Sequence, residues 1–281
     1  MKHRLLTLLL ALFPAIAIWG QRAVTFSKAD SITIERLLDS GATSVLHYAR
    51  QFVDVPYVAH TLEVNDDERL VVNTRQLDCT TLVETATALA LCARQHRKSF
   101  GDYCQVLQQL RYRQGRINGY PSRLHYFTDW IEDNAQMGIV TEVQQRQSPF
   151  TAVQQISLDF MSQHPSSYKA LKAHPELVKD IAAQERALTG KRYRYIPKKN
   201  VRNTAELRSV VKDGDIIAIT CNKKGLDIAH LGFAVWRKDG LHLLNASQIH
   251  KKVVEEPMTL GEYLSKHPSH TGIRIIRINT K

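Results

Sequence analysis

Strand-type segments are concentrated in the last third of the chain, and this distribution limits the fold more than any other feature of the sequence. Apolar residues at helical spacing predict helices at about 26–52 in two pieces, 79–95, 99–113 and 122–138. A single early strand is expected at 69–73, whereas the later segments favour strands at about 193–196, 215–220, 229–237, 241–246, 250–254 and 272–278. No repeat and no flexible linker divides the chain. The pattern predicts one α+β domain with helices packed on an antiparallel, barrel-like sheet.

A cysteine stands at the start of the helix predicted over 79–95. Asp78 is a residue type that favours the N-cap position, so Cys79 is expected to open the helix. A thiol there faces the positive end of the helix dipole and several unpaired backbone N–H groups. Both favour the thiolate, which is the form that attacks carbonyl carbon. Taken alone, Cys79 would be interpreted as a small buried residue, because free cysteine is often buried.

Two polar residues on neighbouring predicted strands could complete a catalytic group. His230 lies near the start of one strand and Asn245 lies on the next, and the turn at Asp239-Gly240 joins the two strands as a hairpin. Cross-strand neighbours lie about 4.5–5.5 Å apart at Cβ, so the two side chains can approach each other. Each residue alone has an ordinary structural explanation. Together with Cys79 they supply a nucleophile, a base and an orienting group.

The order of these segments resembles the NlpC-type branch of the papain-like cysteine peptidases, which cut peptidoglycan. Within it, the chain is most similar to the N-acetylmuramoyl-L-alanine amidase-like proteins, once catalogued as a domain of unknown function. The matching segments are Asp78-Cys79, Gly214-Asp215-Ile216-Ile217, His230-Leu231-Gly232-Phe233-Ala234 and Leu244-Asn245-Ala246-Ser247. Further matches are Pro56-Tyr57 through Glu63, Ser122 through Trp130, Tyr195 through Lys198, and Gly225-Leu226-Asp227. The resemblance implies a papain-like, NlpC-type core, with residues 95–200 as a large helical insertion that shapes the substrate groove.

The resemblance implies hydrolysis of the N-acetylmuramoyl-L-alanine amide through a thioester on Cys79, with muropeptides as substrates. Expected substrate contacts are Tyr57, Ser122, Arg123, His125, Tyr126, Trp130 and Asp227. For most of these residues, packing within the fold is an equally good explanation. Two alternatives stay open: an endopeptidase that cuts the D-glutamyl–diaminopimelate bond, and a catalytically inactive wall-binding module. Acyl transfer to lipid is a weaker third alternative.

Two features depart from the compact members of the branch. His230 follows Cys79 by 151 positions, which is a much longer separation than those members have. The third catalytic position, often histidine in the branch, is Asn245 here. Asparagine can orient an imidazole, as in Cys-His-Asn sites, but it carries no charge. It should therefore raise the basicity of His230 less than a carboxylate would.

The first twenty residues are typical of a secretory signal peptide. Lys2 and Arg4 precede an uncharged run from Leu5 to Trp19, which is short for a membrane span. Residues 21–281 are expected to form a single catalytic domain that is secreted to the periplasm and is monomeric; an uncleaved anchor is the alternative. Loss of Lys2 and Arg4 lowers the net charge from +11 to +9. A basic secreted protein suits an acidic target, and no nucleic-acid recognition motif occurs.

Cysteine and histidine spacing favours no metal site and no cofactor. The chain contains no paired Cys-x-x-Cys and no His-Glu-x-x-His segment, and it lacks a Gly-rich phosphate loop. An even count of four cysteines in a secreted chain invites disulfides. Because Cys79 must stay reduced as a nucleophile, at most one bridge is expected, among Cys92, Cys104 and Cys221.

Overall fold

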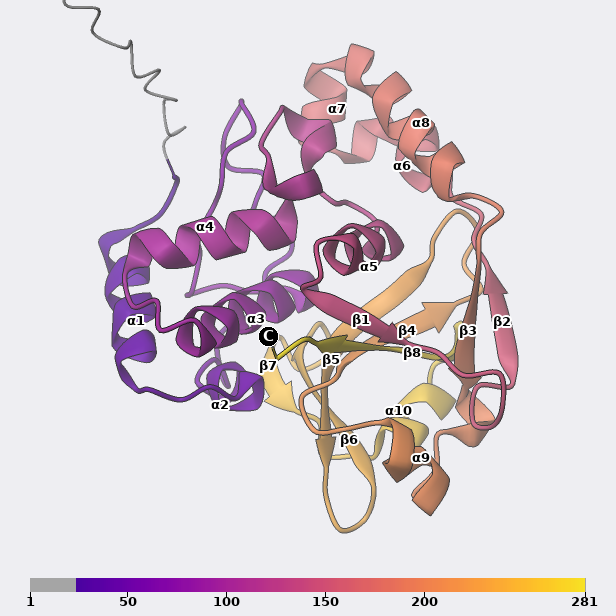
Figure 1. Ribbon diagram of the computed structural model, residues 1–281. Helices are drawn as coiled ribbons and strands as arrows, with labels where there is room; N and C mark the ends of the chain where they lie inside the picture. Colours follow the sequence, from indigo (N-terminus) through magenta and orange to yellow (C-terminus); the bar gives the residue numbers. More distant parts are fainter. Residues whose placement is uncertain (1–23, 281) are drawn as a thin grey trace, which may run out of the picture.

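The computed structural model describes residues 24–280 and joins their strands into one antiparallel, eight-stranded sheet (Figure 1). The strand order is β2-β3-β8-β4-β5-β6-β7, and β1 pairs with β8 beside this path. The strands are β1 (Val140–Val143), β2 (Ala152–Gln155), β3 (Arg192–Pro197), β4 (Ile216–Cys221), β5 (Ile228–Trp236), β6 (Leu241–Ser247), β7 (Lys252–Glu255) and β8 (His270–Ile278). The predicted signal peptide at 1–20 lies outside the described residues.

Helices cover both faces of this sheet, so the predicted α+β class with an antiparallel sheet is confirmed. The helices are α1 (Lys28–Asp39), α2 (Val45–Arg50), α3 (Cys79–Arg94), α4 (Phe100–Arg111), α5 (Phe127–Gln136), α6 (Phe160–Gln163), α7 (Lys169–Ala173), α8 (Val178–Leu188), α9 (Ala205–Val210) and α10 (Leu260–Ser265). No helix within residues 24–280 is both long and apolar enough to cross a bilayer.

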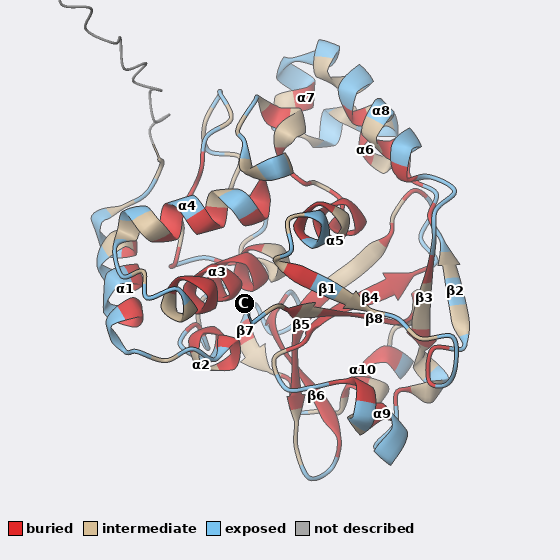
Figure 2. Ribbon diagram, in the orientation of Figure 1, coloured by how far each residue is buried: buried red, intermediate tan, exposed pale blue. Residues whose placement is uncertain are grey.

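The helix that begins at Cys79 is the centre of the main hydrophobic core. Figure 2 shows α3 buried along most of its length. It packs between α1, α2 and α4 on one side and strands β5 and β6 on the other. Its sequence is rich in Ala, Leu and Thr, without the polar face of a surface helix, as expected for a helix enclosed on several sides. The first residue of α3 is therefore held in place by the largest packed region of the protein.

Strand β4 lies between the main core and a second hydrophobic cluster, and its apolar side chains alternate between the two. Ile216 and Ala218 join the main core, whereas Ile217 and Ile219 pack in a second cluster beneath α9 and α10. The continuous apolar run of this strand is therefore buried on both sides. A third cluster, contributed largely by α6, α7 and α8, forms the outlying lobe at the upper right of Figure 1.

Several sequence-based boundaries were wrong. Residues 69–73 form only an isolated bridge, in which Val71 pairs with Thr25, rather than a strand. The helix expected from Ser122 begins instead at Phe127, because the Ser122 hydroxyl donates to the Gly119 carbonyl and closes a 3₁₀ turn. Strand β1 and the short helices α9 and α10 were not predicted. Helix α10 nevertheless has a capping box between Thr259 and its third residue.

The stretch 95–200 does not form one separate unit. It supplies α4 and α5 to the main core, and its strands β1 and β3 both pair with β8. Only its later part, including α6 to α8, lies in the outlying lobe. That residues 95–200 shape a substrate groove stays a prediction.

Candidate active site

Cys79 opens α3, as the sequence predicts. Asp78 is the N-cap: its carboxylate accepts from the Thr81 backbone N–H at 2.8 Å, and the Thr81 hydroxyl accepts from the Asp78 N–H in return. This capping box fixes the first turn, where several N–H groups have no partner within the helix. The thiol is partly buried at this position. Its place on α3 is therefore set by local hydrogen bonding as well as by the core.

The expectation of a resting thiolate is reversed. Burial raises the pKa of the Cys79 thiol to about 12, and the neighbouring Asp78 carboxylate acts in the same direction. Hydrogen bonds from the backbone N–H groups of Leu231 and Thr80 oppose this shift in the thiol pKa without cancelling it. The resting group is consequently a neutral thiol, which needs a base beside it before it can attack.

His230 and Asn245 meet as the sequence predicts. The Nε2 atom of His230 lies 2.9 Å from Oδ1 of Asn245, which is fully buried on β6. Because an amide oxygen only accepts, Nε2 must donate in this bond, and the other ring nitrogen, Nδ1, is left as the acceptor. A Cβ on Gly232 would lie 2.7 Å from the Leu244 carbonyl oxygen, so this glycine permits the close strand approach beside the pair.

Burial also keeps the His230 imidazole neutral. It lowers the pKa of His230 below the ordinary value of 6.5, while the bond to Asn245 and the charge of Glu256 act in the raising direction. The Tyr263 ring, on α10, lies 6.5 Å from the His230 ring between centroids, and the two ring planes make an angle of 30°. The pair at rest is a neutral thiol and a neutral imidazole with its acceptor at Nδ1.

Cys79 and His230 line one cleft of about 180 Å³. Three of the predicted substrate contacts lie in the same cleft, namely His125, Tyr126 and Asp227. Further lining residues that the sequence did not single out include Thr80, Phe127, Met161 and Tyr168. The cleft thus joins the start of α3, the start of β5 and the outlying lobe, which are far apart in sequence.

The three predicted contacts in the cleft are already engaged within the protein. One nitrogen of His125 bonds to the Tyr120 carbonyl oxygen at 3.0 Å, and burial lowers the pKa of His125 to about 3. The Tyr126 hydroxyl donates to the Glu185 carboxylate at 2.6 Å. Asp227 accepts from the Thr128 backbone N–H at 2.7 Å. These groups can contact a substrate only through their remaining atoms.

Three other predicted contacts, Ser122, Arg123 and Trp130, do not line this cleft and are engaged within the fold. Trp130 is fully buried and stacks on Phe127 in the main core. Arg123 is buried and forms ion pairs with Glu63 and Glu68. Ser122 closes the turn described above.

Tyr57 is half-buried beside the proposed nucleophile. Burial raises the pKa of its phenol to about 12, and the nearby Cys79 and Asp78 add to this shift. The phenol therefore stays protonated and able to donate a hydrogen bond.

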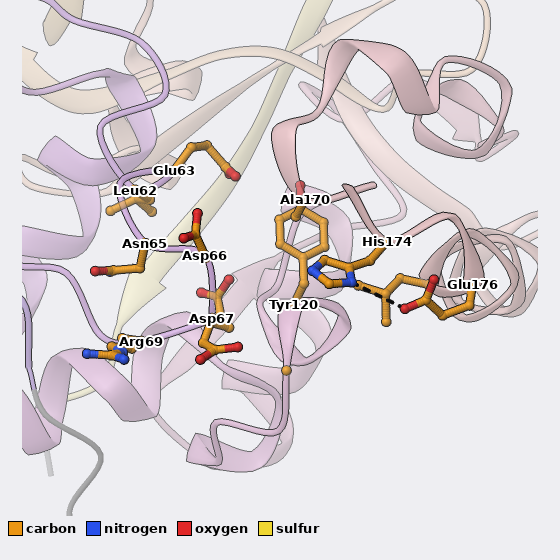
Figure 3. Close-up of a pocket in the computed structure, with 13 residues that line it drawn as sticks. Leu62, Glu63, Asn65, Asp66, Asp67, Arg69, Tyr120, Ala170, His174 and Glu176 are labelled. Atoms are coloured by element: carbon orange, nitrogen blue, oxygen red, sulfur yellow. Dashed lines mark ion pairs between the residues drawn. The ribbon is translucent and has the colours of Figure 1, made fainter. Parts of the chain in front are cut away.

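A second hollow of about 200 Å³ lies beyond Tyr120 (Figure 3). Figure 3 shows acidic side chains of the 62–69 loop on one side of Tyr120 and the His174–Glu176 ion pair on the other. Asp66 is already paired with Lys169 at 3.0 Å. No cysteine, serine or threonine is among the described residues that line this hollow, and its one histidine, His174, is paired with Glu176, so we assign the chemistry to the smaller cleft. Among residues 24–280, no cluster of His, Cys, Asp or Glu has the arrangement of a metal site.

All four cysteines are free thiols. Cys92 on α3 and Cys104 on α4 are both buried in the main core. Cys221 lies at the end of β4.

Sequence reasoning missed two neighbours of the pair. The Leu231 backbone N–H lies beside the thiol, and Tyr263 lies beside the imidazole. The Thr259-x-x-Glu262 capping box was the signal that would have indicated the helix that carries Tyr263. The role of Leu231 depends on its backbone, for which the sequence gives no signal.

The family model and a solved structure that match this chain carry the same description. The chain matches the family model described as N-acetylmuramoyl-L-alanine amidase-like over residues 47–273. The structure of an N-acetylmuramoyl-L-alanine amidase from Bacteroides uniformis is 41% identical with a TM-score of 0.78, and the match covers 85% of this chain and 99% of that one. No curated protein matches significantly.

Two other solved structures are similar. A Bacteroides fragilis protein provisionally named as a xylanase is 46% identical with a TM-score of 0.77; the match covers 83% of this chain and 100% of that one. A Legionella pneumophila protein is 22% identical with a TM-score of 0.68, covering 88% of this chain and 94% of that one. The last likeness shows the fold alone.

Proposed function

The chain belongs to the N-acetylmuramoyl-L-alanine amidase-like family, and on that premise we propose that it is a cysteine amidase of peptidoglycan fragments. The bond cut is the amide between N-acetylmuramic acid and L-alanine. The observation that carries the proposal is the 2.9 Å contact between His230 and Asn245 in the same region as the helix-start Cys79. A nucleophile, a base and an orienting amide in this order are the components of a Cys-His-Asn site.

The chemistry follows from the neutral resting pair. Nδ1 of His230 takes the proton of the Cys79 thiol as its sulfur attacks the carbonyl carbon of the lactyl amide. The nitrogen of L-alanine then leaves with the proton from His230, and a thioester to the muramoyl group forms. Water, deprotonated by the same imidazole, hydrolyses the thioester and restores the thiol. Each proton therefore moves through one atom of His230.

Backbone donors at the start of α3 would stabilise the tetrahedral oxyanion. The Cys79 N–H belongs to the first turn, whose N–H groups have no acceptor within the helix, and it points along the positive end of the dipole. Losing one donor of this kind typically costs about 10²–10³ in rate. Membership of the NlpC-type, papain-like branch is part of this proposal, and the helix-start cysteine and the histidine on an antiparallel sheet support it.

Glycoside hydrolysis fits the cleft less well, despite the name of the Bacteroides fragilis relative. Most glycosidases need two carboxyl groups that flank the scissile bond. Asp227 is the single carboxylate among the described residues that line this cleft, and it already accepts a backbone hydrogen bond.

An endopeptidase that cuts the D-glutamyl–diaminopimelate bond is the main rival, and a binding module without catalysis is the other. Incubation of a purified disaccharide–tetrapeptide with the protein, followed by mass spectrometry, separates them. An amidase releases a free disaccharide and an intact stem peptide. A fragment in which the disaccharide keeps L-alanine and D-glutamate indicates the endopeptidase, and an unchanged substrate indicates the binding module. Cys79→Ala is the matched inactive control.

Location is also proposed. The charged and apolar pattern of residues 1–20 supports secretion to the periplasm, where muropeptides occur. To test this proposal, the protein is expressed with and without a signal peptidase inhibitor, and its N-terminus is determined by mass spectrometry. Gln21 is expected as the first residue only in the untreated cells.

A further inference from the structure

Behind Asn245 lies a buried carboxylate with no lysine or arginine partner among the described residues. Glu256, the residue that follows β7, is only 1% exposed. Its Oε1 accepts from Nδ2 of Asn245 at 3.2 Å, and its Oε2 lies 3.2 Å from Nε2 of His250. Together these contacts form a continuous chain from His230 through Asn245 and Glu256 to His250, whose side chain reaches the surface.

These hydrogen bonds fix the orientation of the Asn245 amide. Two acceptors face its nitrogen: the Glu256 carboxylate and, at 3.4 Å, the Leu243 carbonyl oxygen. An amide nitrogen only donates, so the amide oxygen must face His230. That orientation places the proton of neutral His230 on Nε2. If the amide flipped, its N–H groups would face Nε2 and drive the proton to Nδ1, where the ring could no longer accept the proton of Cys79.

A purely structural explanation for Glu256 is weak. Burying a carboxylate without a lysine or arginine partner is costly, and an apolar side chain or a glutamine would fill the same space at lower cost. The backbone carbonyl of Glu256 also accepts from His242, but any residue at this position could provide that contact. The contacts of the Glu256 side chain are therefore those with Asn245 and His250.

We propose that Glu256 is a positioning residue of the site: it holds the Asn245 amide in one orientation and so keeps His230 as the tautomer whose Nδ1 can accept a proton. This inference rests on the proposed roles of Cys79 and His230, but not on the identity of the substrate. The carboxylate also adds a negative charge that favours the imidazolium formed during the reaction.

Other charged groups near the pair must be kept constant in any test. Asp78 acts on His230 in the same direction as Glu256, whereas His267 acts in the opposite direction. Tyr263 also lies beside His230 and senses the charge of Glu256. His250 faces Glu256 from the loop before β7. A variant of Glu256 alone leaves all of these groups in place.

The test compares Glu256→Gln, Glu256→Asp and the matched control Glu255→Gln. Glu255 is the neighbouring carboxylate and pairs at the surface with Arg50 and Arg237. Its replacement by glutamine therefore removes the same charge from the protein without touching the hydrogen bonds that link His230 to His250. The rate at which iodoacetamide alkylates Cys79 is measured between pH 4 and 9, and kcat/KM on the muropeptide is measured beside it.

Glu256→Gln is expected to move the acidic limb of both profiles down by about one pH unit, because removal of a nearby negative charge makes His230 a weaker base. The plateau should fall about tenfold or more, because glutamine no longer holds one amide orientation. Glu256→Asp keeps the charge and should keep the limb near the wild-type position. Profiles for Glu256→Gln that coincide with those for Glu255→Gln overturn the proposal.

A second measurement needs no variant. Nitrogen-15 NMR of the histidine rings in the wild-type protein reports the tautomer of His230 near neutral pH. A proton on Nε2 is expected, and a proton on Nδ1 overturns the proposal even where Glu256→Gln does not fold. Alkylation requires no substrate: a shifted alkylation profile without muropeptide cleavage supports the role of Glu256 while it refutes the amidase activity.

Discussion

The buried ion pair between Glu84 and Arg111 offers a quantitative test of how α3 is held. Both side chains are almost fully buried, and Arg111 Nε donates to Glu84 Oε2 at 2.7 Å. Arg111 also donates to the Val71 carbonyl oxygen at 2.6 Å. Replacement of Arg111 by methionine leaves the Glu84 carboxylate buried and unpaired, which typically costs about 3–5 kcal/mol. For a protein with about 5–15 kcal/mol of total stability this is a large fraction.

Removal of both partners should cost less than removal of one. In the double variant Glu84→Leu, Arg111→Met no buried charge remains, and the main loss is the hydrogen bond to the Val71 oxygen, about 1–3 kcal/mol. Urea unfolding at pH 7 measures the difference. With a slope of about 2–3 kcal/mol/M, the midpoint for Arg111→Met should fall by about 1–2 M and should partly recover in the double variant.

The penalty should also depend on pH in a defined direction. Burial raises the pKa of Glu84 even with Arg111 beside it, so the carboxyl of the folded Arg111→Met variant holds its proton at a higher pH than in the unfolded chain. Below the unfolded value of about 4.3 both states are protonated, and the penalty is small. It then grows as the pH rises through the folded pKa. A cost below about 1 kcal/mol at pH 7, or a double variant that loses the sum of the two single losses, would refute the explanation.

Further predictions concern the proposed catalytic group. Cys79→Ala should abolish turnover while thermal unfolding stays near wild type, and His230→Ala should in addition slow alkylation of Cys79 by iodoacetamide at neutral pH; an unchanged alkylation rate would separate the histidine from the thiol. Asn245→Ala should leave a slow enzyme and Asn245→His should retain more activity, whereas a full wild-type plateau for the alanine variant would reduce the site to a pair. Because burial lowers the pKa of His230, the acidic limb of wild-type kcat/KM should lie below pH 6.5, and a limb above that value would contradict a neutral buried imidazole. EDTA should leave activity unchanged, and strong inhibition would point to a metal.

The sequence predicted those parts of the site that depend on local pattern. Asp78 and the apolar spacing after it identify the helix start, and the strand-type segments around His230 and Asn245, joined by the turn at Asp239-Gly240, identify two adjacent strands. Trp130 and Arg123 were expected to contact substrate but are buried and do not line the cleft, because aromatic and donor-rich side chains look alike in sequence whether they face a core or a cleft. The core position of Trp130 and the two carboxylates that engage Arg123 are tertiary features.

The protonation state of Cys79 shows the same limit. The helix start was read correctly, but its effect on the thiol pKa was outweighed by burial, which depends on residues packed from distant segments. Glu256 was missed for a related reason: a glutamate after a short strand gives no signal that its carboxylate contacts the amide of Asn245.

The central claim is that Cys79 carries a muramoyl thioester, and hydroxylamine trapping tests it most directly. Neutral hydroxylamine competes with water for a thioester, so part of the acyl group should be released as a hydroxamate. Mass spectrometry of a disaccharide–tetrapeptide digest is predicted to show the hydroxamate of the muramoyl lactyl group beside a free stem peptide, with neither product formed by Cys79→Ala. Hydrolysis without any hydroxamate, or a hydroxamate on the D-glutamyl carboxyl group, would contradict the account.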